Sequence, residues 1–380
     1  MAGGAQTATA TDGGAWAVTG TANALAVATA ALFTNSSSFP APSTFENIAG
    51  PPLTAQDLHW TALGDSWASG VTYKHDPSLD WTAPRDEKCR RILDAYAVQL
   101  YNDTTWSGAR RQIFTFPACS GSRYADIQGQ TNFMGDKPEF ATLTIGGNDA
   151  NFFPVVRDCI YQYDTFHSYG GEYPAPGDCA DSIAQAQTFI SSGQLATDVQ
   201  SKAIQVVYDA GVNNFPGFKV FLTGYAHFFN VDDDATDCND QSFGPGLHRP
   251  KLTMVLRKAI NNLVEQINTA YSNVVASMNN PDIQFLDISP GFDGHRFCEP
   301  GQDNYDNENS NQEGETWIWN FHWFWPNGVD NGTAPADEID PASSDFSRGE
   351  IARIFHPTRQ GHGAIKEIVK IAVRKAYDVD

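Results

Sequence analysis

The chain has 380 residues and a formal net charge of −21, from 24 Lys and Arg against 45 Asp and Glu. It is 41% hydrophobic and 12% aromatic, which is typical of a globular protein with a large core and not of a disordered chain. The acidic excess argues against nucleic acid and anionic membrane surfaces as partners, because both need concentrated Lys and Arg.

The first 54 residues are rich in Ala, Thr, Ser and Gly and form a low-complexity leader. No basic residue precedes Lys74, so the basic region that opens a signal peptide is missing. Residues 14–33 are Ala-rich but broken by Thr and Asn, unlike a membrane span. We therefore predict a poorly ordered leader over 1–54, one domain over 55–380, and no integral membrane segment.

Strands and helices alternate from Asp57 onward. Buried-strand patterns occupy residues 59–63, 112–116, 140–145, 218–223 and 282–288. Helical patterns occupy residues 91–101, 183–210, 251–278 and 360–377. This alternation predicts an α/β fold with a parallel five-stranded central sheet covered by helices on both faces. Functional residues of such a sheet lie at the carboxyl ends of its strands.

Residues 301–347 depart from this pattern, because they contain ten acids and no Lys or Arg. Within them, the aromatic run 317–325 has neither a helical nor a strand period. We predict an acidic, aromatic-rich insertion loop here, outside the core. The aromatic run is either a lid or substrate platform, or a staple buried against the body. If the loop borders the site, its charge disfavours anionic substrates.

The six cysteines allow 15 pairings, of which the sequential one is the simplest: Cys89–Cys119, Cys159–Cys179 and Cys238–Cys298. Bridges closing such loops stabilise by roughly 3–4 kcal/mol each. The alternative is six free buried thiols in a cytosolic protein. No cysteine or histidine spacing is typical of zinc, so we expect no metal. Three N-x-S/T triplets favour a secreted glycoprotein, at Asn35, Asn102 and Asn331.

Three strand ends carry short polar turns that can support acyl transfer, which needs a nucleophile, a base and donors for an oxyanion. Ser66 is the candidate nucleophile, and His356, ahead of the last helix, is the candidate base. The oxyanion donors are the backbone N–H groups of Ser66 and Gly121 and the side-chain amide of Asn148. Gly121 has no Cβ to obstruct the substrate.

Four blocks of this sequence resemble the GDSL/SGNH hydrolases in family order: ALGDSWASG (62–70), ACSGSR (118–123), TIGGND (144–149) and HPTRQG (356–361). The likeness is closest to the secreted actinobacterial esterase and lipase branch and covers about residues 57–377. It implies a flavodoxin-like three-layer α/β/α fold, three sequential disulfides and ester hydrolysis without a cofactor. It also implies the roles just given for Ser66, Gly121, Asn148 and His356.

The sequence departs from the family at the acid of the triad, because Arg353 stands where the family usually has Asp. In the branch that the chain resembles, a backbone carbonyl at that position orients the histidine. We therefore predict that the carbonyl of Arg353 orients His356, which leaves a Ser–His dyad. The rival interpretation is a distant carboxylate, Asp345 or Glu350.

Structural interpretations compete at each motif. Gly64-Asp-Ser66 can be an N-cap turn, Asn148-Asp149 an Asx turn in which Asp149 is structural, and His356 a plain loop residue. His362 is a weaker candidate base. Trp67 either lines an acyl pocket or packs the first turn of a helix.

We expect a secreted, monomeric serine ester hydrolase whose substrate is a small-molecule, lipid or carbohydrate ester. The carbohydrate-esterase alternative rests on aromatic rings that can stack on sugars, and a second alternative is a non-catalytic binding protein on the same fold. The sequence has no G-x-S-x-G, so an ordinary α/β-hydrolase lipase is not expected. It also has no G-x-G-x-x-G after the first strand, which argues against a nucleotide-binding sheet.

Overall fold

The described residues of a computed structural model of the chain are 57–71, 76–108, 110–161, 173–243, 250–302, 304, 315–320 and 353–377. Several sequence predictions lie outside them: the 1–54 leader, the triplets at Asn35 and Asn331, the carboxylates Asp345 and Glu350, and most of the 301–347 segment. None of the described helices is long and apolar enough to cross a membrane.

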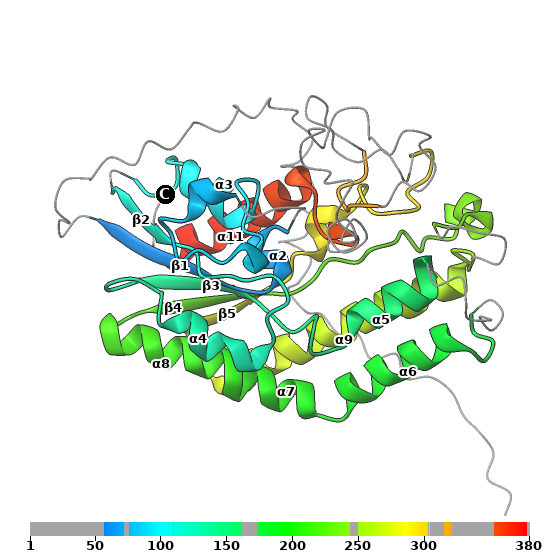
Figure 1. The fold of residues 1–380 in the computed structure, drawn as a ribbon, viewed down its shortest axis with the longest axis horizontal. Helices are drawn as coiled ribbons and strands as arrows, with labels where there is room; N and C mark the ends of the chain where they lie inside the picture. The colour runs from blue at the N-terminus through cyan, green and yellow to red at the C-terminus, as the bar shows by residue number, and fades with distance from the viewer. Residues whose placement is uncertain are drawn as a thin grey trace, which may run out of the picture. The chain divides into compact units, whose positions relative to one another are not determined.

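The strands of the described residues form one parallel five-stranded sheet in the order β2-β1-β3-β4-β5 (Figure 1). Their bounds are β1 Leu58–Gly64, β2 Gln112–Thr115, β3 Phe140–Thr144, β4 Lys219–Thr223 and β5 Ile283–Leu286. The central strands are apolar because both faces of a parallel sheet are covered. The predicted fold class and strand number are confirmed.

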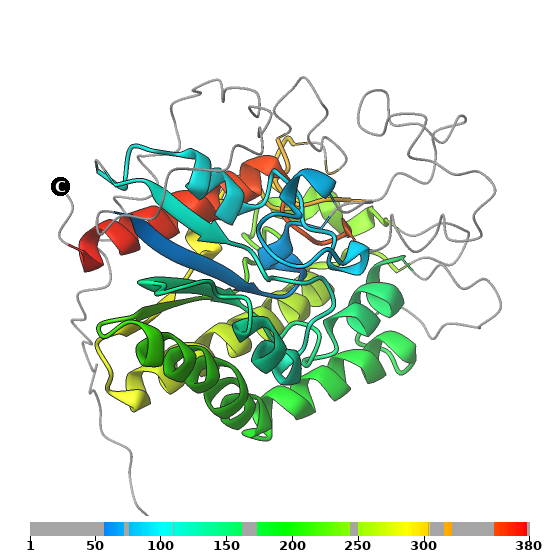
Figure 2. The same ribbon diagram turned by 60° about the vertical axis from the view of Figure 1, so that its left-hand side comes forward.

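Helices cover both faces of the sheet, giving three layers (Figures 1 and 2). On one face lie α3 Tyr96–Asn102 and α11 Arg359–Ala376, which contact each other. The other face carries α4 Ile127–Thr131, α8 Gln205–Asn214 and α9 Met254–Met278. The other α-helices of the described residues are α2 Ser66–Ser69, α5 Phe152–Val156, α6 Asp178–Ser191 and α7 Gln194–Asp198.

The predicted helix over residues 183–210 is a chain of shorter pieces. It breaks after α6, where Gly193 takes a left-handed conformation, and π-helical turns over Val199–Ile204 separate α7 from α8. Short segments of 3-10 or π-helix elsewhere are Pro77–Leu79, Glu87–Cys89, Tyr124–Asp126, Arg157–Tyr161, Ala235–Asp240 and Ser289–Phe292.

The end of β1 lies unusually close to the neighbouring strand. Gly64 has φ of +130°, and a Cβ on it would lie 1.9 Å from the carbonyl oxygen of Thr144. Only glycine fits such a position, so β1 can turn directly into α2 at the carboxyl edge of the sheet. This turn delivers Ser66 to the edge where the other polar motifs end.

The cysteines pair sequentially, as Cys89–Cys119, Cys159–Cys179 and Cys238–Cys298, and none of them is free. The first bridge joins the 3-10 turn Glu87–Cys89 to the segment that carries Gly121. The backbone N–H of Ser120 also donates to the Cys89 carbonyl at 3.0 Å. A covalent and a hydrogen-bonded link therefore hold this segment in place.

Candidate active site

Ser66 and His356 are in direct contact, although 290 positions separate them in the sequence. Ser66 opens α2, whose N-cap is Asp65, and His356 lies just before α11. The Ser66 Oγ lies 2.6 Å from the His356 Nε2, within hydrogen-bonding distance. This is the contact between a hydroxyl nucleophile and a base that acyl transfer requires.

The other ring nitrogen of His356 faces a backbone carbonyl, but that of the neighbouring residue. Nδ1 lies 3.0 Å from the Ile354 carbonyl oxygen, whereas the Arg353 carbonyl accepts the backbone N–H of His356, also at 3.0 Å. The carbonyl that bonds the ring belongs to Ile354, one position after the predicted Arg353, and the rival carboxylates Asp345 and Glu350 lie outside the described residues. Because a carbonyl oxygen can only accept, Nδ1 carries the proton and Nε2 is free to accept one from Ser66.

Burial governs the charge of this histidine. It lowers the pKa of His356 to about 4, and the nearby carbonyls of Ile354 and Arg353 offset part of that effect. The positive charge of Arg90 lowers the pKa further. The ring is therefore neutral at neutral pH, which is the state that a general base needs.

A short strap formed by residues 316–320 braces the backbone of His356. The Trp319 N–H donates to the His356 carbonyl at 2.8 Å, and the Trp319 carbonyl accepts from Phe355 N–H at 2.9 Å. Ile318 forms an antiparallel bridge with Pro357. Thr316, Ile318 and Asn320 are fully buried, so the expectation of a loop outside the core does not hold for this part.

The strap also contacts Arg353, which stands where the GDSL/SGNH hydrolases usually have the acid of the triad. The Arg353 guanidinium lies 4.5 Å from the centre of the Trp319 ring and is buried with it. Trp317 stacks on His295, with ring centres 3.6 Å apart. Of the two interpretations of the aromatic run, the buried staple fits Trp319, which is buried, whereas Trp317 is half-buried; residues 321–325 lie outside the described residues.

The predicted oxyanion donors line the same pocket as Ser66 and His356. Gly121 has φ of +83°, and a Cβ there would meet nothing within 4 Å, so its backbone is open to a ligand. The Asn148 amide donates to the Ser122 carbonyl at 3.0 Å. That amide nitrogen carries two hydrogens, and this bond orients it while using one of them.

The other candidate residues have structural environments. Asp149 accepts a hydrogen bond from the Tyr124 backbone at 3.1 Å, and burial raises its pKa to about 6. His362 is buried in α11, and neither ring nitrogen has a hydrogen-bond partner among the described residues. It therefore does not reach Ser66 as a base. Asn102 is exposed at the end of α3, and its glycosylation stays a prediction.

The pocket has a volume of about 700 Å³ and a mainly apolar lining. Trp67 lines it, and its ring also packs against Phe228 and Phe292. Arg90 is its cationic residue. The apolar lining residues are Phe152, Phe153, Val156, Phe228, Val264, Ile267, Ile354 and Phe355.

Sequence reasoning gave no role to Asp65 and did not single out Tyr225. The Asp65 carboxylate accepts from Trp67 N–H at 3.0 Å and from the Tyr225 hydroxyl at 2.6 Å. Burial raises the pKa of Asp65 to about 7. Tyr225 follows the end of β4, and this position after a parallel strand was the available signal.

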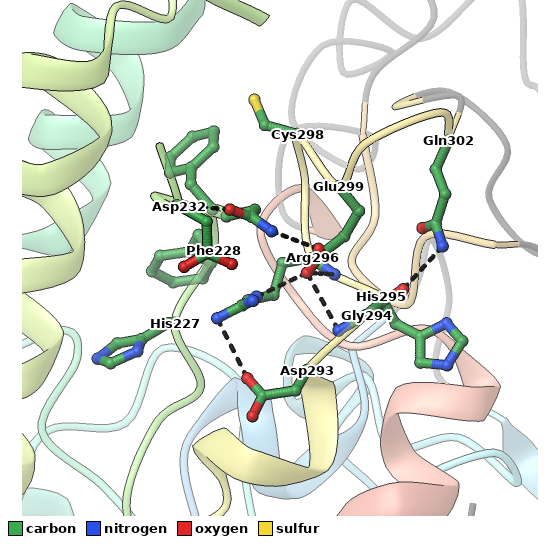
Figure 3. A network of polar contacts seen from close by, with 12 residues as sticks. His227, Phe228, Asp232, Asp293, Gly294, His295, Arg296, Cys298, Glu299 and Gln302 are labelled. Carbon is green, nitrogen blue, oxygen red and sulfur yellow. Dashed lines mark hydrogen bonds and ion pairs between the residues drawn. The ribbon is translucent and has the colours of Figure 1, made fainter. Parts of the chain in front are cut away.

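A buried ionic network fastens the wall that contains Phe228 (Figure 3). The Glu299 carboxylate binds Arg296 Nε at 2.7 Å, Gly294 N–H at 3.1 Å and the Asn230 amide at 2.5 Å. Since Asn230 lies two residues after Phe228, these bonds link the chain after β4 to the chain after β5.

Comparison with known proteins adds to this picture, although no family model matches the chain. It is 25% identical over 266 residues to Lipase 1 of Streptomyces coelicolor, covering 70% of this chain and 76% of the relative. It is 28% identical over 253 residues to a lipase of Streptomyces rimosus, covering 66% and 76%. The crystal structure of an extracellular lipase from Streptomyces rimosus matches with a TM-score of 0.53 and 22% identity, covering 83% of this chain and 99% of that one. The structural match shows a shared fold.

Proposed function

We propose that this chain, a carboxylic ester hydrolase of the lipase and esterase type within the GDSL/SGNH family, acts through a Ser66–His356 dyad and an acyl-enzyme intermediate. The observation that carries the proposal is the 2.6 Å contact between Ser66 Oγ and His356 Nε2. The apolar pocket around that contact supports it. The histidine needs no carboxylate, because the Ile354 carbonyl holds its other nitrogen.

The reaction runs in two halves. His356 Nε2 takes the proton of Ser66 Oγ as that oxygen attacks the ester carbonyl, and the resulting oxyanion accepts hydrogen bonds from Ser66 N–H, Gly121 N–H and the Asn148 amide. When the intermediate collapses, His356 passes the proton to the departing alcohol. Water then gives a proton to His356 and attacks the acyl carbonyl. When this second intermediate collapses, His356 passes the proton to Ser66 Oγ and the acid leaves.

The pocket favours an acyl chain over a sugar as the group beside the ester. Its lining is mainly aliphatic and aromatic, and each buried methylene contributes roughly 0.8 kcal/mol. The described strap tryptophans pack against protein: Trp319 against Arg353 and Trp317 against His295. Rates on p-nitrophenyl esters should therefore rise with acyl length beyond acetate, and release of acetate from acetylated xylan should be slow.

We propose that the chain works outside the cell, where the three disulfides persist. The bridges Cys89–Cys119, Cys159–Cys179 and Cys238–Cys298 suit an oxidising compartment. We also propose a monomer, with glycosylation at the exposed Asn102.

Replacing Ser66 with alanine tests the mechanism. Because the acyl-enzyme forms on Ser66 Oγ, Ser66→Ala should lower kcat by roughly 10³-fold or more. A fluorophosphonate probe should label the wild type and not the variant. An unlabelled wild type would favour a non-catalytic binding protein, and full esterase activity in Ser66→Ala would reject the mechanism.

A further inference from the structure

Two buried polar residues touch the site without a part in the reaction: Asp65 and Tyr225. We propose that Tyr225 is a positioning residue that fixes the nucleophile turn and the oxyanion loop relative to each other. Its hydroxyl would then hold Ser66 and Asn148 at the separation that one ester carbonyl requires. This inference rests on the proposed Ser66 mechanism.

The geometry joins both halves of the site through a single oxygen atom. The Tyr225 hydroxyl donates to Asp65 Oδ2 at 2.6 Å and accepts from Gly147 N–H at 2.8 Å. Asp65 directly precedes Ser66, and Gly147 directly precedes Asn148. The phenol therefore bonds the residue before the nucleophile and the residue before the oxyanion amide.

The carboxylate of Asp65 completes the link on the nucleophile side. Its Oδ1 accepts from Trp67 N–H at 3.0 Å, so one carboxylate holds α2 on one oxygen and Tyr225 on the other. Asp65 is 1% exposed and Tyr225 is 5% exposed. Water therefore has little access to replace the phenol as the bridge.

Tyr225 is itself held from outside the site. Its backbone N–H donates to Asn268 Oδ1 at 2.9 Å, and its carbonyl accepts from Asn268 Nδ2 at 2.8 Å. Asn268 is buried in α9, the longest described helix. The Tyr225 ring also packs edge-on against Trp67, with centres 5.4 Å apart. The backbone of Tyr225 is thus anchored independently of the two loops that its hydroxyl joins.

Tyr225→Phe removes only the bridging oxygen. Gly147 N–H loses its acceptor, Asp65 loses a donor, and the two loops lose their common tie. A displacement of about 1 Å between reacting groups can lower a rate roughly 10²-fold. We expect kcat to fall about 10- to 100-fold while KM changes less than about threefold, because alignment matters most in the transition state.

The matched control is Tyr377→Phe. The Tyr377 hydroxyl donates to the Glu139 carbonyl at 2.7 Å, at the amino end of β3 and away from the site. The control loses a comparable hydrogen bond and should keep wild-type kcat. A wild-type kcat in Tyr225→Phe, or a change confined to KM, would overturn the inference.

A double-mutant cycle gives a second test of the bridge. In Asp65→Ala the side chain can bond neither Trp67 N–H nor the Tyr225 hydroxyl. Asp65→Ala should by itself lower kcat, and the double variant should lose no more than the worse single one, since both break the same bridge. Additive losses would mean independent roles and overturn the inference. Activity that survives Ser66→Ala would reject the mechanism itself, whereas an inactive Ser66→Ala beside a fully active Tyr225→Phe would reject only the positioning role.

Discussion

Replacing His362 with leucine is expected to protect the protein against acid. His362 is 1% exposed in α11, stacks on Tyr96 with ring centres 6.4 Å apart, and has no hydrogen bond to either ring nitrogen within the described part of the chain. Burial lowers its pKa to about 3, and the neighbouring His356 adds to that effect. The native protein therefore keeps this ring neutral where an unfolded chain would protonate it.

The size of the effect follows from the two pKa values of His362. Its ordinary pKa is 6.5, so below that pH the unfolded chain binds a proton that the native state refuses, and stability falls as the pH drops towards 3. About pH 4.5 lies two units below the pKa of His362 in the unfolded chain, so protonation of this residue on unfolding lowers the free energy of unfolding by about 2.7 kcal/mol. At about pH 7.5 the same term is close to zero.

Urea unfolding at these two pH values measures the difference between wild type and His362→Leu. We expect the variant to gain about 2–3 kcal/mol relative to wild type between about pH 7.5 and about pH 4.5. Asp65 and Asp149, whose pKa values are raised by burial, act in the opposite direction but cancel in this comparison. His362→Asn, polar but not titratable, should show the same pH-dependent gain. A difference that does not change with pH would refute the reasoning.

Two further substitutions test the framework around the site. Glu299→Gln should lower the free energy of unfolding by about 3–5 kcal/mol, because it leaves buried donors facing an uncharged amide. Asp293→Asn, at the exposed edge of the same network, should lower it by at most about 1 kcal/mol. Equal losses in urea unfolding would contradict this prediction. Gly64→Ala should prevent folding, since its Cβ would overlap the Thr144 carbonyl. Gly129→Ala in α4, where a Cβ has open space, should raise the melting temperature slightly. A soluble, active Gly64→Ala would show that β1 can shift.

The strands were predictable because parallel strands buried on both faces leave short apolar runs in the sequence. The expected strand over 140–145 is Phe140–Thr144 in the structure, and the helix expected over 251–278 is Met254–Met278. The helix expected over 183–210 was too simple, because a hydrophobic period continues through a break such as that at Gly193. Periodicity reports which side is buried and not whether the backbone is continuous.

The site was predictable where a motif sits at the end of a strand. Ser66, Gly121 and Asn148 follow β1, β2 and β3, whose carboxyl ends lie along one edge of the sheet. Tyr225 follows β4 but has no polar turn around it, so its position after a strand was the one local signal that it is not an ordinary core tyrosine. The sequence also gave no sign of its hydrogen-bond partner Asn268, which lies on the buried face of α9.

The carbonyl that faces His356 could not be assigned to one residue from the sequence, because it depends on a turn. Phe355 has φ of +60°, a strained value for a non-glycine residue, and it separates Ile354 from His356. Its ring packs in an aromatic cluster, with its centre 4.9 Å from that of Phe228 and 5.2 Å from that of Phe297. Tertiary packing that the local sequence does not reveal therefore holds the turn.

This packing bears on the proposed role of His356 as a base, because among the described residues its Nδ1 faces a carbonyl and not a carboxylate. A triad carboxylate both orients the imidazole and stabilises its charged form, whereas a carbonyl such as that of Ile354 supplies mainly orientation. Burial already lowers the pKa of His356 to about 4, so the charged ring is costly and even a small displacement from Ser66 would slow the proton transfer. The chain compensates by fixing the backbone on both sides of the histidine, through the Phe355 cluster and the Trp319 strap. Arg353 contacts that strap through the Trp319 ring, so this arginine helps to brace the backbone next to His356.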